Sequence, residues 1–137
     1  MDQLYIRHDY TAELRPFNPI PAPIVNLNEF ALLQSQADQI QLSTLVRSYI
    51  SSIIIALRLH KDVISTSISA RAVGDIRNLV RVMALQEDKF NNWVNAESVP
   101  LAAEMCVGFR LRFETGAEGV TSQSILKEVI QNVRAPF

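Results

Sequence analysis

The stretch LSTLVRSYISSIIIALRLH, residues 42–60, decides the fold of this 137-residue chain. Its apolar residues recur at i, i+3, i+4 and i+7, which is the spacing of one face of an α-helix. The residues of this stripe are Leu42, Leu45, Val46, Tyr49, Ile50, Ile53, Ile54 and Leu57. Ile55 and Leu59 add apolar side chains to the opposite face. A helix that is apolar on two sides is buried on more than one of them, so the stretch predicts a central helix with several neighbours.

The segments on either side of this helix also have helical patterns. Before it, Asn28 is a typical helix-capping residue, and a short helix is expected from there to about Gln39. After it, the pair at 74–75 (Gly-Asp) precedes a second strong helix over 76–90. This second helix carries apolar residues on both sides, so it too is expected to be mostly covered.

The C-terminal part of the chain predicts two further helices and one ambiguous segment. Pro100 lies near the start of a short Ala-rich helix, and Thr121 or Ser122 caps a last amphipathic helix. Between them, residues 107–113 alternate apolar and polar side chains, which predicts a short strand, with a continued helix as the alternative. The expected fold class is therefore mainly α: a helical bundle with, at most, one short strand near 107–113.

The N-terminal residues differ from this body in composition. Prolines stand at positions 16, 19, 21 and 23, and each of them fixes φ and removes a backbone donor. Residues 1–27 are therefore predicted to form an extended arm, and residues 28–137 the α-helical body. Apolar residues are interleaved with the prolines, so we expect the arm to pack against its own body or against a neighbouring subunit. The predicted assembly residues of the arm are Leu14, Phe17, Ile20, Ile24 and Val25.

Composition and charge exclude several classes of function. The hydrophobic content of 48% and the charged content of 20% are typical of a globular protein, and a net charge of −1 gives no global basic field for nucleic acid. The longest apolar run is far shorter than the roughly 20 residues that cross a bilayer, and the N-terminus does not have the pattern of a signal peptide. Cys106 is the only cysteine. A cytoplasmic location without membrane contact is the expectation.

Catalysis has little support in the sequence. The two histidines, His8 and His60, and the single cysteine, Cys106, are far apart along the chain. Cys106 lies between apolar neighbours, where thiols are usually inert, and His60 is expected at the end of a helix, where the dipole favours it. The four glycines form no phosphate-binding loop. We expect no enzymatic activity, no cofactor and no metal.

The basic residues are mostly arginine, a side chain whose rigid fork of donors suits carboxylates and phosphates. Arg77 and Arg81 form an i, i+4 pair of like charges, which is unfavourable unless an anion binds between them. Arginines and hydroxyls of this kind can hold the backbone of a single RNA strand without reading its sequence. The alternative is that the arginines form ion pairs with the 14 acidic residues. The predicted RNA-binding residues are Arg47, Ser51, Arg58, Arg71, Arg77 and Arg81.

Three short elements resemble the tobamovirus-like coat proteins of rod-shaped plant viruses. Residues 75–78 (Asp-Ile-Arg-Asn) are similar to the Asp-Thr-Arg-Asn element of that family, 37–42 (Ala-Asp-Gln-Ile-Gln-Leu) to its Ala-Asp-Pro-Ile-Glu-Leu, and 100–104 (Pro-Leu-Ala-Ala-Glu) to its Pro-Thr-Thr-Ala-Glu. They occur in the family's order. Leu79 stands where the family has a second arginine, so the resemblance carries over only Arg77 as an RNA contact. It implies a four-helix bundle that stacks into a helical rod around one RNA strand.

Two functions from different classes follow from these observations. The first is a structural, self-assembling subunit, a viral coat or nucleocapsid-like protein that packages single-stranded RNA in a helical filament and is found in the virion. The second is an α-helical protein–protein interaction module that binds a non-identical partner and no nucleic acid.

Overall fold

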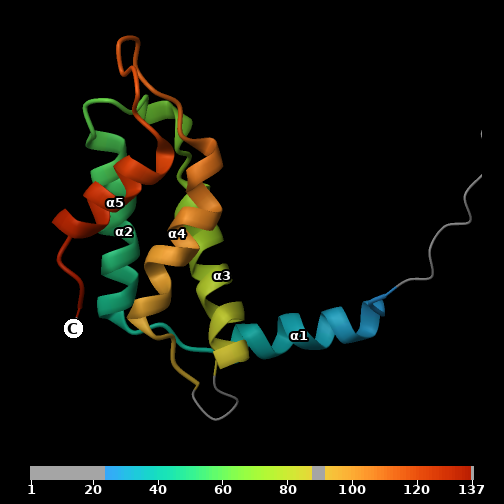
Figure 1. The fold of residues 1–137 in the computed structure, drawn as a ribbon. Coiled ribbons are helices and arrows are strands. Elements are labelled where there is room, and N and C mark those ends of the chain that lie inside the picture. The colour runs from blue at the N-terminus through green and yellow to red at the C-terminus, as the bar shows by residue number, and fades with distance from the viewer. Residues whose placement is uncertain (1–23, 88–91, 137) are drawn as a thin grey trace, which may run out of the picture.

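The structure, a computed structural model, describes residues 24–87 and 92–136 (Figure 1). Five α-helices occur in these ranges, so the predicted mainly α class is confirmed. They are α1 (Leu27–Gln39), α2 (Thr44–Leu59), α3 (Arg71–Glu87), α4 (Val99–Val107) and α5 (Ser122–Asn132). Single 3-10 turns lie between them: η1 (Ser65–Ser67), η2 (Ala96–Ser98) and η3 (Gly108–Arg110).

Helices α2 to α5 pack side by side, and α2 supplies more buried apolar residues than any other helix (Figure 1). The central helix predicted over 42–60 is confirmed. Ile50, Ile53 and Leu57 are completely buried, and Tyr49 is buried on the same helix. The facing core residues from the other helices are Ala72, Ile76, Val80, Ala84, Val99, Ala102, Ala103, Val107, Ile125, Leu126 and Val129. The core therefore lies along the whole length of α2.

Side-chain caps account for where three of the helices begin. The Ser43 hydroxyl accepts a hydrogen bond from the Val46 N–H at the start of α2. Thr121 caps α5, as predicted, in a reciprocal arrangement with Ser124. At α1 the cap is Asn26 rather than the predicted Asn28, because Asn26 forms a capping box with Glu29. The helical body thus begins at Leu27.

The strand expected over 107–113 is not formed, which corrects that prediction. Helix α4 runs to Val107 and continues directly into η3, so the backbone becomes extended only at Leu111. Val107 and Leu111 are both buried, at the i, i+4 spacing of a helical turn, whereas Phe109 between them is exposed. The alternation of apolar residues therefore did not reflect two faces of a strand. The strand-like pairing that residues 107–113 make with the described part of the chain is an isolated bridge between Val63 and Phe113.

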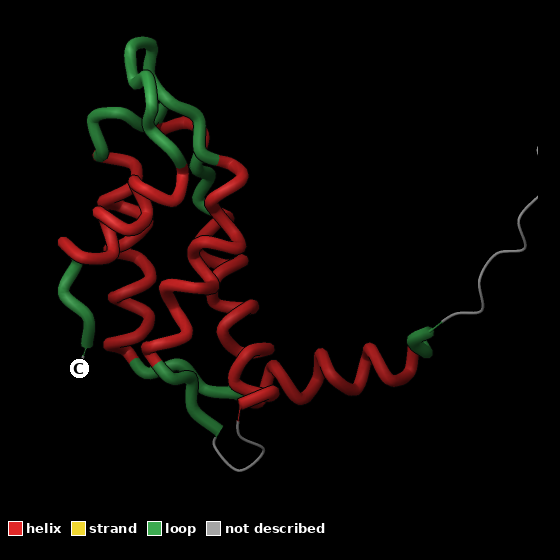
Figure 2. The backbone as a smooth tube through the Cα atoms, viewed as in Figure 1, coloured by secondary structure: helices red, strands yellow, loops and turns green. Residues whose placement is uncertain are grey.

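Two such isolated bridges hold the loops together at the opposite ends of the helical bundle (Figure 2). At one end Gln41 bridges to Trp93, and the Val94 N–H donates to the Gln41 carbonyl at 3.1 Å. At the other end the Ile64 N–H donates to the Arg112 carbonyl at 2.9 Å. Each bridge joins two linkers that are distant in sequence and so holds the ends of their helices next to one another.

We predict that Ile53→Ala lowers the free energy of unfolding by about 2–5 kcal/mol, because it opens a cavity in the centre of the core. Ile55→Ala is the matched control, since Ile55 is on the same helix and is 56% exposed. Its expected effect is below about 0.5 kcal/mol. Urea unfolding followed by circular dichroism measures both values. Equal losses in the two variants would contradict the assigned burial of α2.

Candidate interaction surface

Helix α1 projects away from one end of the bundle and contacts it mainly through α3 (Figure 1). Of its 13 residues only Ala37 is buried, and Ile40 anchors the chain directly after it. Leu27 is 85% exposed, Phe30 61% and Leu33 54%. These three residues and Ala37 form one stripe along the helix. We call Leu27, Phe30 and Leu33 the α1 stripe, which is an apolar surface left bare by the bundle.

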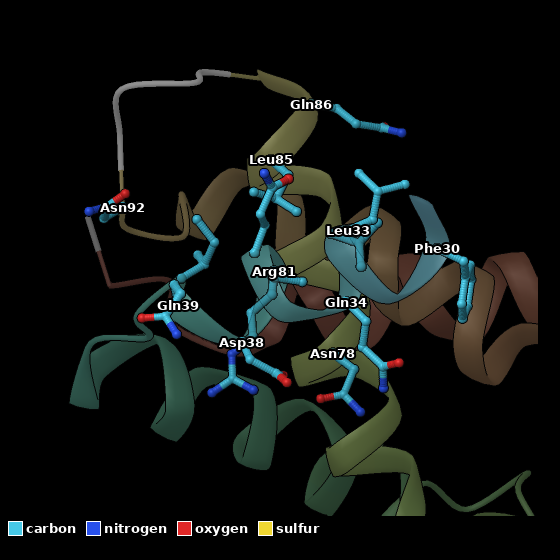
Figure 3. Close-up of a pocket in the computed structure, with 14 residues that line it drawn as sticks. Phe30, Leu33, Gln34, Asp38, Gln39, Asn78, Arg81, Leu85, Gln86 and Asn92 are labelled. Carbon is cyan, nitrogen blue, oxygen red and sulfur yellow. The ribbon is translucent and has the colours of Figure 1, made fainter. Parts of the chain in front are cut away.

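A groove of about 870 Å³ runs between α1 and the C-terminal half of α3 (Figure 3). Phe30, Leu33, Val82 and Leu85 give it apolar walls, and amide side chains give it a polar rim. Figure 3 shows Phe30 at one end of the groove and Asp38 toward the other. The complete lining is Phe30, Leu33, Gln34, Gln36, Ala37, Asp38, Gln39, Ile40, Asn78, Arg81, Val82, Leu85, Gln86 and Asn92.

Two of the predicted RNA-binding arginines have unused donors. The Nε atoms of Arg77 and Arg81 are buried and have no hydrogen-bond partner among the described residues. Arg81 lines the groove, and Arg77 lies one turn earlier on α3. A buried guanidinium N–H without an acceptor is costly, so an anionic or carbonyl ligand at either Nε would remove this cost.

Two other members of the predicted set have partners within the chain. Arg58 donates from Nε and Nη2 to the Ile68 carbonyl, at 3.0 and 2.7 Å. Arg71 lies 3.7 Å from the Asp75 carboxylate, which also accepts from Arg110 at 2.8 Å. Arg71 thus has the ion pair with an acidic residue that the sequence left open as an alternative, whereas Arg58 binds a backbone carbonyl.

The remaining members, Arg47 and Ser51, lie one turn apart near the start of α2. The Nε atom of Arg47 donates to the Leu42 carbonyl at 3.2 Å, and Arg47 as a whole is exposed. The Ser51 hydroxyl donates to the Arg47 carbonyl at 3.0 Å, a bond within its own helix. Arg47 therefore remains available to a ligand, whereas the donor of Ser51 is used.

The arm residues are only partly described. Leu14, Phe17 and Ile20 lie outside the described residues. Ile24 is 97% exposed, and Val25 is exposed as well, immediately before α1. These two residues extend the apolar character of the α1 stripe toward the N-terminus.

The imidazole of His60 and the thiol of Cys106 both lie within the packed part of the fold. The Nδ1 atom of His60 accepts from the Asp62 N–H at 3.3 Å, and its Nε2 lies 3.5 Å from the Glu128 carboxylate, so His60 connects α2 to α5.

Burial raises the pKa of the Cys106 thiol, and the nearby Asp75 carboxylate raises it further, so little nucleophilic thiolate is present. The described ranges contain no group of three metal-ligating side chains and no helix long and apolar enough to cross a membrane.

Sequence reasoning missed the α1 stripe, whose residues it assigned to the body. It predicted an interaction surface made of the arm and the second faces of the helices over 42–60 and 76–90. On that face of α3, Val82 is exposed and Leu85 lines the groove. Hydrophobic periodicity shows that a helix face requires cover but not which molecule supplies it. Leu32, which lies on the opposite side of α1 from the stripe, was a signal that this helix is not buried in one core.

The arrangement as a whole can bind an apolar helix or segment that carries negative charge. The α1 stripe and the groove walls supply the apolar contacts, and Arg81 supplies the positive charge. Neither a protein-family model, nor a curated protein, nor a solved structure matches the chain.

Proposed function

We propose that this protein is a structural subunit that assembles with further copies of itself. The observation that supports this function is the exposure of Leu27, Phe30 and Leu33 on a helix held away from the bundle. Isolated helices shorter than about 12–15 residues are marginally stable in water, and most helices in proteins are stabilised by packing of one face. Helix α1 has 13 residues and only one buried side chain of its own, so it lacks that packing in the single subunit.

The alternative, an interaction module for a non-identical partner, would use the same surface. Self-assembly is the stronger proposal because the chain offers both sides of the contact: an apolar helix and a groove of suitable chemistry. A module that binds a non-identical partner needs only the apolar helix or only the groove.

We further propose that the assembled subunits hold single-stranded RNA, as in a coat or nucleocapsid protein. Arg77 supports this part, since its buried Nε has no acceptor within 24–87 and 92–136 and since it occupies the arginine position of the Asp-Thr-Arg-Asn element that the sequence resembles. Arg47, which is exposed near the start of α2, is the second candidate contact. A few arginines per subunit are sufficient where each subunit covers only a few phosphates.

We predict that size-exclusion chromatography with light scattering gives a mass above the 15.4 kDa of one chain, increasing with protein concentration. Absorbance at 260 and 280 nm across the peak reports any nucleic acid carried with it. A constant 15.4 kDa at all concentrations would refute self-assembly. An assembly without nucleic-acid absorbance after purification in low salt would argue against RNA packaging alone.

A second prediction concerns the RNA contacts. Replacing Arg47 and Arg77 together by Gln removes two proposed phosphate contacts, so the slope of log K against log salt should decrease in magnitude by about 1.4. Fluorescence anisotropy with a labelled single-stranded RNA at several salt concentrations measures this slope. Arg134→Gln, in the exposed segment after α5, is the control and should leave it unchanged. The RNA proposal is refuted if the double variant and the control give the same slope as the native chain.

A further inference from the structure

We infer that the groove between α1 and α3 is occupied by α1 of a second copy of this chain, lying antiparallel to the first. Each copy then covers the α1 stripe of the other. This inference rests on the proposed self-assembly and identifies the surface through which it takes place.

The apolar residues meet the requirement of such a symmetric contact. In a two-fold interface the same patch serves on both subunits, so its residues must act both as the wall of the groove and as the inserted segment. Phe30 and Leu33 do both: they line the groove, and they belong to the exposed α1 stripe. Val82 and Leu85 on α3 provide the opposite wall for the incoming helix.

Charge complementarity identifies a second copy of α1 as the occupant. Helix α1 carries two acidic residues, Glu29 and Asp38, and no basic residue. Residues 76–86 of α3 carry Arg77 and Arg81 and no acidic residue. Within the groove itself Arg81 and Asp38 are the charged lining residues, and the Arg81 Nε has no acceptor among the described residues. A second acidic, apolar helix would bring a further carboxylate to Arg81.

The antiparallel direction follows from where the charges lie. Phe30 lies at one end of the groove and Asp38 toward the other, and Arg81 is the only arginine among the described residues that line it (Figure 3). An antiparallel second helix brings its Glu29 to the Asp38 end, where Arg81 can bridge the two carboxylates. A parallel second helix would bring its Asp38 to Arg81 instead, but it would place the two Glu29 carboxylates side by side at the Phe30 end, where no arginine among the described residues lines the groove. Antiparallel packing also opposes the two helix dipoles.

The first test places charges in the α1 stripe of the full-length chain. Phe30→Asp combined with Leu33→Asp should weaken self-association at least about 30-fold, because the carboxylates would be buried in an apolar contact. Ile55→Asp combined with Leu59→Asp is the matched control, since these residues are equally apolar and exposed on α2. Its dissociation constant, measured by sedimentation velocity, should stay within about threefold of that of the native chain. Circular dichroism confirms that both variants remain folded.

A second test examines the predicted direction of the helices. Arg81→Glu should weaken association, and Glu29→Lys should do the same. Because Glu29 also belongs to the capping box of α1, the decisive readout is the recovery in the double variant and not the loss in Glu29→Lys alone. The two changes combined in one chain should restore most of the lost affinity, because the new positive charge at position 29 then faces the new negative charge at position 81 of the other copy. A double variant that associates no better than either single variant would overturn the antiparallel arrangement.

The outcomes separate this inference from the proposed function. If the native chain is monomeric at every concentration, self-assembly itself is wrong. If it assembles and the α1 variant assembles equally well, only the docking of α1 is overturned. If Phe17→Asp combined with Ile20→Asp abolishes assembly while the α1 variant does not, the N-terminal segment and not α1 is the occupant, and the inference is overturned as well.

Discussion

Burial of α2 among the other helices is the interaction on which the rest of the structure depends. Because Ile50, Ile53 and Leu57 are completely buried, this helix sets the positions of α3, α4 and α5 around it. Side chains at the C-terminal end of α2 also hold the segment before α3 and helix α5 in place. Arg58 holds the Ile68 carbonyl just before α3, and His60 reaches Glu128 on α5. The polar contacts of the bundle are thus positioned by an apolar core.

Helices α2 to α5 and the loops that flank them complete this core without α1. The first helix is attached through Ala37, Ile40 and the backbone bridge at Gln41, while its first two turns extend beyond the bundle. A fold whose core is complete can expose such a helix without losing its own stability. The exposed surface of α1 is the observation on which the proposed contact with a second subunit rests.

The elements could be predicted where local chemistry decides them, as in the central helix and the Thr121 cap. The strand at 107–113 could not, because Val107 and Leu111 satisfy an alternating pattern and a helical turn equally well. For the candidate site, arginine content indicated which side chains to consider but not their partners. Arg58 and Arg71 bind Ile68 and Asp75, which depends on tertiary packing, whereas the Nε atoms of Arg77 and Arg81 have no acceptor among the described residues. The groove depends on how α1 meets α3, which periodicity does not encode.

The scarcity of core contacts in the first two turns of α1 has a consequence for the energetics of association. Segments with few buried contacts open locally at a free energy close to zero, far below that of global unfolding. The N-terminal turns of α1 would then fray in the single subunit, and the entropy of ordering them would be lost at the moment of docking. Part of the binding free energy would be consumed in this way, so the contact would be reversible and cooperative with helix formation. A subunit built like this would be monomeric when dilute and would pair reversibly as its concentration rises.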